Sequence, residues 1–364
     1  MPTKEQVLEA LGHVQDPEIH RDIVSLNMVK DVRCEGGKVS FTYVLTTPAC
    51  PLKGQMEREA REAILKIPGV KEVRIQMSAN VQKDIRLESA LPPGVKNIIA
   101  VGSGKGGVGK STVAANLAVS LALEGAQVGL LDADVYGPNQ PQMFGIPQFD
   151  LQPDGEGKIA PPVAHHVKVM SMGFLLKGDT PVIWRGPMLH GAINQFLKDV
   201  RWGDTDYLIV DLPPGTGDVQ ISLCQSVPLL GAVVVTTPQS IATSDVKKAM
   251  VMFKRLNVPL LGIIENMTEF ICPHCKKTSE IFSHGGAQSL SENYQTPVIG
   301  KIPLDPEVCQ MGEIGKPIAL GRPDSPTAVA FREIAKQLAA RISLENVKSK
   351  TVTKIEVETG GTRK

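Results

Sequence analysis

One glycine-rich stretch limits the possible folds of this chain more than any other feature. Residues 104–111 are Gly-Lys-Gly-Gly-Val-Gly-Lys-Ser, which fits the phosphate-binding pattern of a glycine, four residues and Gly-Lys-Ser/Thr. An apolar run of the buried-strand kind, Asn97–Val101, precedes it, and Thr112–Glu124 has the apolar spacing of a helix. Glycines at such a turn let backbone N–H groups converge on an anion, and the helix N-terminus adds partial positive charge. The stretch therefore predicts a nucleotide-phosphate site between a buried strand and a helix.

The loop residues are expected to bind the phosphates and a cation. We expect Lys110 to reach the β- and γ-phosphates and the Ser111 hydroxyl to bind Mg²⁺. The remaining nucleotide contacts are expected from Gly104, Lys105, Gly106, Gly107, Val108, Gly109 and Thr112. Lys105 is unusual, because positions inside such a loop normally carry small or neutral side chains. With this lysine the loop resembles that of the MinD/ArsA/Mrp class of dimeric ATPases, which implies a catalytic Lys105 that reaches the partner subunit's nucleotide. A solvated surface lysine is the alternative.

The chain is expected to form two domains of different class. Residues 1–80 carry helical and β-rich runs in the order α-β-β-α-β, which predicts a small α+β domain. Residues 81–95 are polar, end near Pro92-Pro93-Gly94 and are interpreted as a linker. Residues 96–345 alternate apolar runs with helical stretches, which predicts an α/β domain with a mostly parallel sheet and helices on both faces. Residues 346–364 lack an apolar period and are expected to form a loose tail.

The individual elements can be placed by their patterns. In the small domain we expect helices at Lys4–Leu11 and Leu52–Ile67, and strands at Val29–Cys34, Lys38–Leu45 and Val70–Met77. In the larger domain the expected strands are Asn97–Val101, Gln127–Leu131, Val167–Met172, Tyr207–Val210, Ala232–Thr236, Leu260–Glu265 and Val298–Ile302. Helices intervene between these strands, and a last helix is expected over Ser325–Leu344.

Composition excludes several classes of function. The 364 residues carry a net charge of +1, with both signs spread along the chain, so no nucleic-acid footprint is present. The longest apolar runs, near Val227–Val235 and Val258–Ile264, fall short of the ~18 residues that a membrane span needs. The first residues lack the apolar core of a signal peptide. Six cysteines in a chain of this size do not make a disulfide scaffold, and we expect a cytoplasmic protein.

Polar residues follow three of the expected strands. Asp132 and Asp134 follow one strand, Asp211 follows the next candidate, and Asn266 follows a third. Because parallel strands present their carboxyl ends at one crevice, these groups are expected to face the phosphate loop. Asp211 fits the carboxylate that lies opposite the loop lysine near the metal, and the Gly215 N–H is expected to contact the γ-phosphate. Aspartates also cap helices and turns, so Asp132 alone indicates little.

Cys272 and Cys275 form the one Cys-x-x-Cys pair in the sequence. They provide half of a tetrahedral site, since structural zinc and common iron–sulfur clusters each take about four ligands. A two-fold dimer would supply the other half, because it doubles every residue near its axis. Zinc, a redox dithiol and an incidental pair are the alternatives. The residues left out of the predicted site are single cysteines, usually small buried hydrophobes, and loop histidines: Cys34, Cys224, Cys309, His274 and His284.

Cys50 has two open interpretations. It precedes Pro51 at the expected start of a helix, where a thiolate is stabilised and the thiol pKa is lowered. A small buried residue is the other interpretation. The run Thr46–Pro51, with Asp16-Pro17-Glu18 upstream, resembles the small domain of iron–sulfur assembly factors. That resemblance leaves both interpretations in place.

Five motifs together resemble the Mrp/ApbC family of iron–sulfur cluster carriers. They are the loop at 104–111, Asp132–Asn139, Trp184–Pro187, Asp211–Asp218, and Asn266-Met267 followed by Cys272–Cys275. The resemblance implies a homodimeric ATP hydrolase of slow turnover. It further implies a [4Fe-4S] cluster that Cys272 and Cys275 of two subunits share, with cluster donor proteins and recipient apoproteins as partners.

The same resemblance assigns roles to further residues. It implies that Asp134 orients the attacking water, and that Asn266 and the loop near Pro303 hold adenine. The guanine-selective string Asn-Lys-x-Asp does not occur in the sequence. Two other functions remain open: a zinc-stapled dimeric ATPase for protein delivery or cargo partitioning, and a nucleotide switch with negligible turnover.

Overall fold

The computed structural model describes residues 2–84, 92–175, 186–272, 274–275 and 277–359. The chain divides into two compact units, Met1–Gln82 with Ala339–Lys364, and Lys83–Leu338. Residues from Ala339 onward group with the first unit. The sequence analysis instead places residues 339–345 in the larger domain. One contact of this grouping is the hydrogen bond that Asn346 Nδ2 donates to the Gln82 carbonyl at 3.2 Å. Trp184 and Arg185 of the fourth motif lie outside the described residues.

The first unit has the predicted α-β-β-α-β order with one addition, the short pair β1 and β2. Thr3 and Gln6 form a reciprocal capping box at the start of α1. In β4 every second residue is buried, which gives the three-stranded sheet one apolar face. Strand β4 pairs antiparallel with β3 and parallel with β5. The elements are α1 (Lys4–Leu11), β1 (Gln15–Asp16), β2 (Arg21–Asp22), β3 (Val29–Glu35), β4 (Lys38–Leu45), α2 (Lys53–Leu65) and β5 (Glu72–Ala79).

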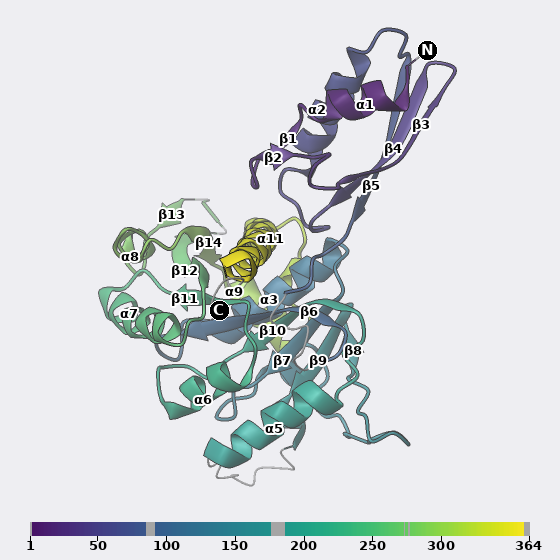
Figure 1. The fold of residues 1–364 in the computed structure, drawn as a ribbon. Helices are drawn as coiled ribbons and strands as arrows, with labels where there is room; N and C mark the ends of the chain where they lie inside the picture. The colour runs from purple at the N-terminus through teal and green to yellow at the C-terminus, as the bar shows by residue number, and fades with distance from the viewer. Residues whose placement is uncertain (1, 85–91, 176–185, 273, 276, 360–364) are drawn as a thin grey trace. The chain divides into compact units, whose positions relative to one another are not determined.

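The second unit is built on a nine-stranded, mostly parallel sheet (Figure 1). Its order is β13-β12-β11-β6-β10-β7-β9-β8, and β14 pairs with β12 beside this path. Only β8 and β13 pair antiparallel with their neighbours among the described strands. The strands are β6 (Val95–Ser103), β7 (Val128–Asp132), β8 (Val163–Ala164), β9 (Val167–Ser171), β10 (Thr205–Asp211), β11 (Gly231–Thr236), β12 (Leu260–Ile271), β13 (Thr278–Ser279) and β14 (Val298–Leu304).

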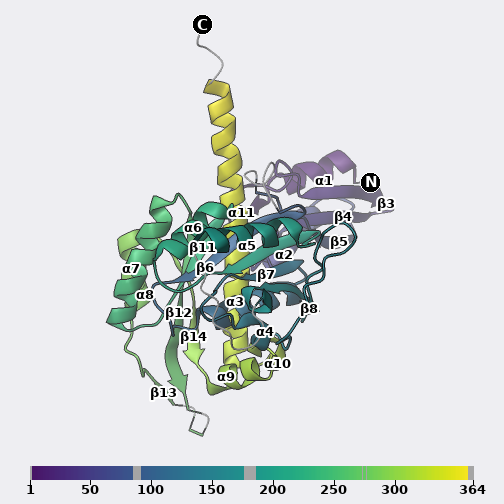
Figure 2. The ribbon, with the colours of Figure 1, turned by 90° about the horizontal axis from the view of Figure 1, so that it is seen from below.

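Helices cover both faces of this sheet, as the sequence predicts. Helix α3 packs on one face, while α5, α6 and α7 lie on the other (Figure 1, Figure 2). All residues of β7 and β11 are buried, which requires that both faces be covered. The helical segments are α3 (Lys110–Leu123), α4 (Gln140–Met143), η2 (Met172–Leu175), α5 (Gly186–Asp199), α6 (Asp218–Ser226), α7 (Ser240–Arg255), α8 (Gly286–Tyr294), α9 (Pro306–Glu313), α10 (Ile318–Gly321) and α11 (Pro326–Thr359).

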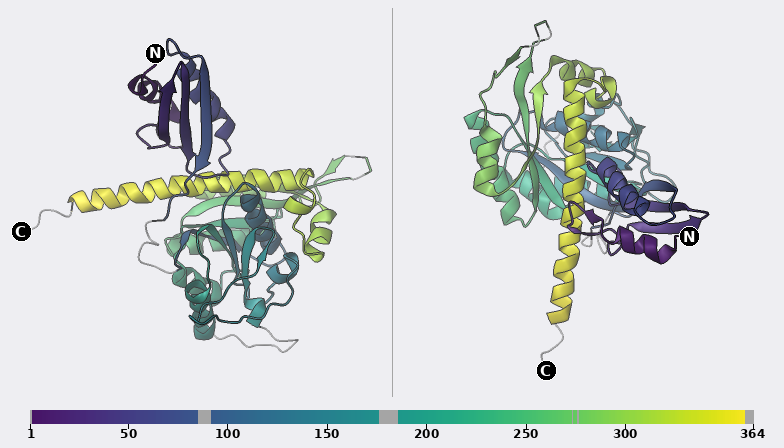
Figure 3. Two further views of the ribbon diagram at one scale, coloured as in Figure 1. Left: turned by 90° about the vertical axis from the view of Figure 1, so that its right-hand side faces the viewer. Right: turned by 90° about the horizontal axis from the view of Figure 1, so that it is seen from above.

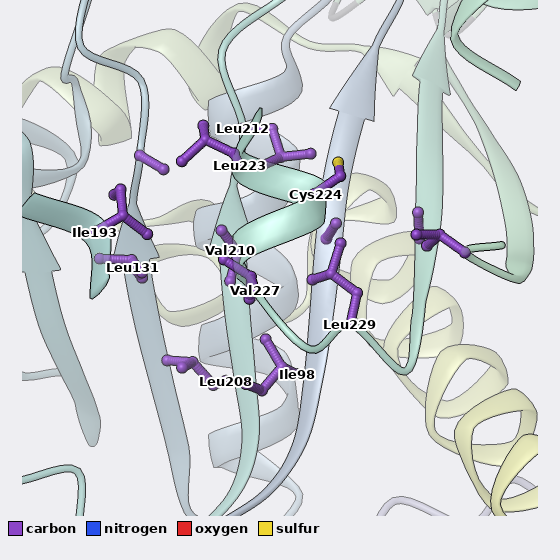
Figure 4. Close-up of a cluster of buried hydrophobic side chains, with 14 of the residues drawn as sticks. Ile98, Leu131, Ile193, Leu208, Val210, Leu212, Leu223, Cys224, Val227 and Leu229 are labelled. Atoms are coloured by element: carbon purple, nitrogen blue, oxygen red, sulfur yellow. The ribbon is translucent and has the colours of Figure 1, made fainter. Parts of the chain in front are cut away.

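A large apolar core lies between the sheet and helices α5–α7. Ile98 of β6 and Leu208 of β10 belong to this core and lie on the side of Val227 and Leu229, the residues that follow α6 (Figure 4). Cys224 of α6 is 6% exposed and packs inside this cluster. Its thiol is therefore a small apolar core group, in agreement with the expectation for an isolated cysteine.

Strand β12 is longer than predicted. The sequence predicts that it ends at Glu265, but it continues to Ile271 because Phe270 and Ile271 pair with β13. Between the two parts lies Met267, a non-glycine residue at φ 58°, where the register with β14 shifts. The end of β12 and β13 extend away from the rest of the sheet (Figure 2, Figure 3). This hairpin carries the cysteine pair.

The C-terminal helix α11 also exceeds its prediction. It runs as one helix from Pro326 to Thr359 (Figure 3), so residues 346–359 are helical where a loose tail is expected. No glycine or proline follows Pro326 until Gly360, and a helix propagates through residues of moderate propensity once it has nucleated. No helix within the described ranges has the length and apolar character that crossing a membrane requires.

Candidate functional site

The predicted phosphate loop joins β6 to α3, and two of its glycines cannot be replaced without a clash. Gly109 precedes α3 at φ 81°, and a Cβ there would lie 2.3 Å from Asn266 Nδ2. A Cβ on Gly104 would lie 2.2 Å from the carbonyl carbon of Asp245 in α7. Such distances exclude any side chain, since the loop backbone lies directly against its neighbours. The loop is therefore held closely by β12 and α7.

Lys110 is buried at the centre of the site. Its Nζ lies 2.5 Å from Asp211 Oδ1 and 3.6 Å from Asp134 Oδ2. It also donates to Ser111 Oγ at 3.2 Å. Asp211 lies here because its strand, β10, pairs in parallel with β6, the strand that leads into the loop. The predicted lysine and both predicted carboxylates thus lie together at the carboxyl ends of the strands.

Two carboxylates within the described residues pair with this ammonium group, and a third, that of Asp132, lies close to Asp211. Asp132 and Asp211 are 0% exposed, and Asp134 is 6% exposed. Burial, and then the charge of Asp211, raises the pKa of Asp132 to about 8. Burial also raises the pKa of Asp134, which the charge of Lys110 partly opposes. Burial therefore opposes the ionisation of these carboxyls, and their hard oxygen atoms suit a divalent cation such as Mg²⁺, whose charge would favour the ionised forms.

Hydrogen bonds fix these carboxylates in place. Asp132 accepts bonds from Ser171 Oγ at 2.9 Å and from the Asp134 N–H at 3.2 Å. Asp134 Oδ1 accepts from the N–H groups of Tyr136 and Gly137 at 3.2 and 3.3 Å. The second oxygen of Asp134 is the one that faces Lys110, so this carboxylate is oriented toward the loop.

Gln140 is part of the site, although no sequence motif selects it. Its Nε2 donates to Asp211 Oδ2 and to the Ser111 carbonyl, both at 2.9 Å. Its N–H donates to Asp132 Oδ2 at 3.2 Å. The one available signal was its position directly after the Asp132–Asn139 motif, at the start of the short helix α4. Gln140 links three segments of the site.

A cavity of about 550 Å³ opens beside the loop. Gly109, Thr112, Asn266 and Pro303 line it, which brings together the residues predicted for the nucleotide and its base. Its other walls are mainly apolar, as is typical of pockets for flat ligands. The apolar residues include Met267, Phe270, Leu304 and Val308.

Asn266 connects this cavity to the loop. Its Nδ2 donates to the Val108 carbonyl at 2.9 Å, and its Oδ1 accepts from the Met267 N–H at 3.0 Å. The side chain therefore fixes both the loop backbone and the bend in β12. A base-binding role remains a prediction, since both polar atoms already have partners within the protein.

Lys105 and Gly215 lie on the loop side of the site. Within the described residues the half-exposed Lys105 side chain makes no ion pair, while its carbonyl accepts from Ser103 Oγ at 2.9 Å. The Gly215 N–H donates to the Ser103 carbonyl at 3.0 Å. Contact between Gly215 and a γ-phosphate would require this N–H to exchange partners.

The cysteine pair lies at the end of the β12–β13 hairpin. Cys272 is half-buried and Cys275 is exposed, and the Cys272 N–H donates to the Lys277 carbonyl at 3.0 Å. No three His, Cys, Asp or Glu side chains within the described ranges are arranged to hold a metal. The pair therefore lies at an accessible edge of the sheet, and its role as half of a four-ligand set stays a prediction.

The structure does not support a lowered pKa for the Cys50 thiol. It lies just before α2, but burial raises its thiol pKa to about 11, and the nearby backbone N–H groups only partly oppose this. Its Sγ contacts Met56 Sδ at 3.9 Å. Desolvation exceeds the effect of the helix N-terminus here. The structure favours the small buried residue over the activated thiol.

We expect Cys50 to alkylate far more slowly than Cys275 at pH 8. A thiol of pKa about 11 is only about one part in a thousand thiolate at that pH, and burial restricts access further. Iodoacetamide time courses followed by peptide mass spectrometry measure both rates, and urea-unfolded protein provides the control in which the difference disappears. Equal rates in the folded protein would contradict the assignment of Cys50 as a half-buried thiol of raised pKa.

The loop, the buried lysine–aspartate pair and the parallel sheet define the chain as a P-loop NTPase. The sequence pattern of the NUBPL iron-transfer P-loop NTPase family matches residues 94–339, and that of the iron-sulfur cluster assembly protein family matches residues 4–76. The chain therefore belongs to the NUBPL-type iron-transfer P-loop NTPases, with an assembly-type domain at its N-terminal side.

Individual relatives agree with this family. The chain is 50% identical to the iron-sulfur cluster carrier protein of Deinococcus radiodurans, over 94% of this chain and 96% of that protein. It is 40% identical to the protein of the same description from Escherichia coli, over 92% and 91%. The nucleotide-binding protein of Archaeoglobus fulgidus in complex with ADP is 39% identical, with a TM-score of 0.56 over 64% of this chain and 89% of that one. The MinD cell division ATPase of Pyrococcus furiosus, at 24% identity and a TM-score of 0.52, shares the fold.

Proposed function

We propose that the protein binds and hydrolyses ATP, and that two copies carry one [4Fe-4S] cluster between them for transfer to apoproteins. The observation that carries the proposal is that one strand, β12, connects the phosphate loop to the cysteine pair. Asn266 in this strand lies against the phosphate loop, and Cys272 follows the end of the same strand. The relatives described as iron-sulfur cluster carriers support the identity of the cargo.

In this proposal the loop binds the phosphates and the apolar cavity takes adenine. Lys110 exchanges part of its contact with Asp211 for the β- and γ-phosphates when the nucleotide enters. Mg²⁺ would be held by the Ser111 hydroxyl, with Asp211 and Gln140 beside it, and it supplies charge neutralisation of the phosphates. Asn266 and Pro303 form walls of the base pocket.

Hydrolysis would use Asp134 to orient the attacking water. Its Oδ1 is held by two backbone N–H groups, so the carboxylate has one fixed orientation. Its burial excludes bulk water, which strengthens every charge interaction with the transferring phosphoryl group. We propose slow turnover, because the cycle serves a binding and release event rather than bulk hydrolysis.

The cluster is the cargo, and its thiolate ligands would be Cys272 and Cys275 from each of two copies. Two chains supply four sulfur ligands, the number that a [4Fe-4S] cluster takes. The exposed edge position permits approach by donor and recipient proteins. Thiolates that hold a labile cluster require a reducing compartment, so we propose the cytoplasm.

Anaerobic purification tests the cargo, and phosphate release tests the hydrolysis. The proposal expects the visible absorption of an iron–sulfur cluster, and transfer rates to an apoprotein that differ between ATP and a non-hydrolysable analogue. A colourless protein with zinc would favour the protein-delivery alternative. Nucleotide binding without measurable phosphate release would favour the switch.

Lys105→Ala is expected to slow hydrolysis by about 100-fold or more while weakening ATP binding much less. The reason is that a cation aimed at developing charge acts mainly in the transition state. Steady-state phosphate release and titration with a fluorescent ATP analogue measure the two effects separately.

Mixed dimers test whether Lys105 acts across the interface. Lys105→Ala protein mixed with Asp134→Ala protein should recover part of the activity, because one of the two sites then has an intact Asp134 and a partner with Lys105. Absence of recovery at every mixing ratio, with subunit exchange demonstrated by sizing, would rule out action in trans.

A further inference from the structure

One polar atom of the buried Gln140 amide has no hydrogen-bond partner in the described part of the chain. The residue is 0% exposed, and its Oε1 has no hydrogen-bond partner within the described residues. A buried acceptor without a donor is unfavourable, because it has given up its hydrogen bonds to water. Such a cost is normally removed when a ligand supplies the missing donor.

The orientation of the Gln140 amide follows from its partners. Gln140 Nε2 contacts the Ser111 carbonyl and Asp211 Oδ2. A carbonyl oxygen can only accept a hydrogen bond, and so can the oxygen of an ionised carboxylate. The nitrogen must therefore face them, and the oxygen is left on the other side of the amide. A flipped amide would place two pairs of acceptors against each other.

The ammonium group of Lys110, at the centre of the site, already has partners of its own. Lys110 Nζ lies 2.5 Å from Asp211 Oδ1 and 3.2 Å from Ser111 Oγ. These contacts also mark the place where a cation would enter, beside the Ser111 hydroxyl and Asp211. A magnesium ion keeps several of its waters when it binds to nucleotide phosphates, and each such water is a strong donor.

We propose that Gln140 is a positioning residue that accepts a hydrogen bond from a magnesium-bound water and holds Asp211 toward the cation. This inference rests on the proposed ATP site, and it adds the residue that sets the affinity of that site for magnesium. Gln140 acts through the water and through Asp211, and it does not contact the transferred phosphoryl group.

Two substitutions separate this role from simple packing. Gln140→Met keeps the length of the side chain but removes both the donor and the acceptor, so the magnesium concentration for half-maximal nucleotide binding should rise about tenfold. Gln140→Glu keeps an acceptor oxygen and adds a negative charge. Because this carboxylate replaces the donor beside Asp211 Oδ2, nucleotide binding should be weak in EDTA and should recover as magnesium neutralises the two carboxylates.

The measurements are a magnesium titration of fluorescent ATP-analogue binding and the binding of Mn²⁺ in the presence of ADP, followed by electron paramagnetic resonance. Gln220→Met is the matched control, because Gln220 is also buried, at 1% exposure, and its amide lacks a partner in the described structure. The control should change thermal stability at most, and leave the magnesium requirement unchanged.

The outcomes distinguish the inference from the function on which it rests. Magnesium-dependent binding in the wild type with an unchanged requirement in Gln140→Met would overturn the inference alone. Equal losses in Gln140→Met and Gln140→Glu, with and without magnesium, would assign Gln140 to packing instead. A wild type that binds no nucleotide with magnesium would overturn both.

Discussion

Replacing Lys110 with methionine is expected to abolish ATP hydrolysis and to destabilise the nucleotide-free protein. Hydrolysis is lost because the cation that contacts the phosphates is removed. Stability falls because Lys110, at 6% exposure, is the positively charged partner described for Asp211, which is 0% exposed. Removing one member of a buried ion pair typically costs about 3–5 kcal/mol. The sequence alone predicts an intact fold, since it shows the lysine only as a phosphate ligand.

The double variant Lys110→Met with Asp211→Asn separates the two effects. The second change removes the uncompensated charge, so most of the lost free energy of unfolding should return while hydrolysis stays absent. Urea unfolding and phosphate release on both variants provide the comparison. A single variant that keeps wild-type hydrolysis would remove Lys110 from the catalytic site, and one that keeps wild-type stability would show that the pair with Asp211 is not stabilising.

Changing either Cys272 or Cys275 to alanine is expected to abolish stable cluster binding. Each change removes two of four proposed ligands from the dimer, and a [4Fe-4S] cluster requires about four. The wild type should hold one cluster for every two chains. Anaerobic reconstitution followed by iron and sulfide counting and by sizing measures both quantities. ATP hydrolysis should survive at least in part, because the phosphate site uses different residues.

Two cysteines serve as controls for this experiment. Cys224→Ala should keep the cluster, since Cys224 packs in the apolar core (Figure 4). Cys309→Ala should also keep it, since Cys309 is exposed on α9 and lines the base cavity. A cluster held by a monomer, or by protein lacking both Cys272 and Cys275, would overturn the shared site.

The parts of the fold that follow a local rule could be predicted from the sequence. The loop glycines, the apolar strands and the polar residues at their carboxyl ends each follow one such rule, and together they placed Lys110, Asp134 and Asp211 in one site. The α/β class and the small α+β domain followed from the alternation of apolar runs.

The remaining features depend on contacts between distant segments. Gln140 acquires its role only because β10 and α3 bring Asp211 and the Ser111 carbonyl to its amide. The raised pKa of Cys50 reflects burial by the rest of its domain, which a helix-start pattern does not contain. The extension of β12 to Ile271 depends on pairing with β13, since Thr268-Glu269 interrupts the apolar run.

The central strands and the edge strand of the larger sheet are expected to differ in the free energy of local opening. The strands of the nucleotide site, β6 and β10, each have a neighbour on both sides, whereas β13 is the terminal strand of the order. Opening free energies in a protein range from near zero at such edges to the global value in core strands. Amide protons of Val210 therefore exchange with solvent mainly through complete unfolding, while those near Ile271 exchange through local fraying. Local opening of the cysteine hairpin at this edge therefore does not require the strands that carry the phosphate loop to separate.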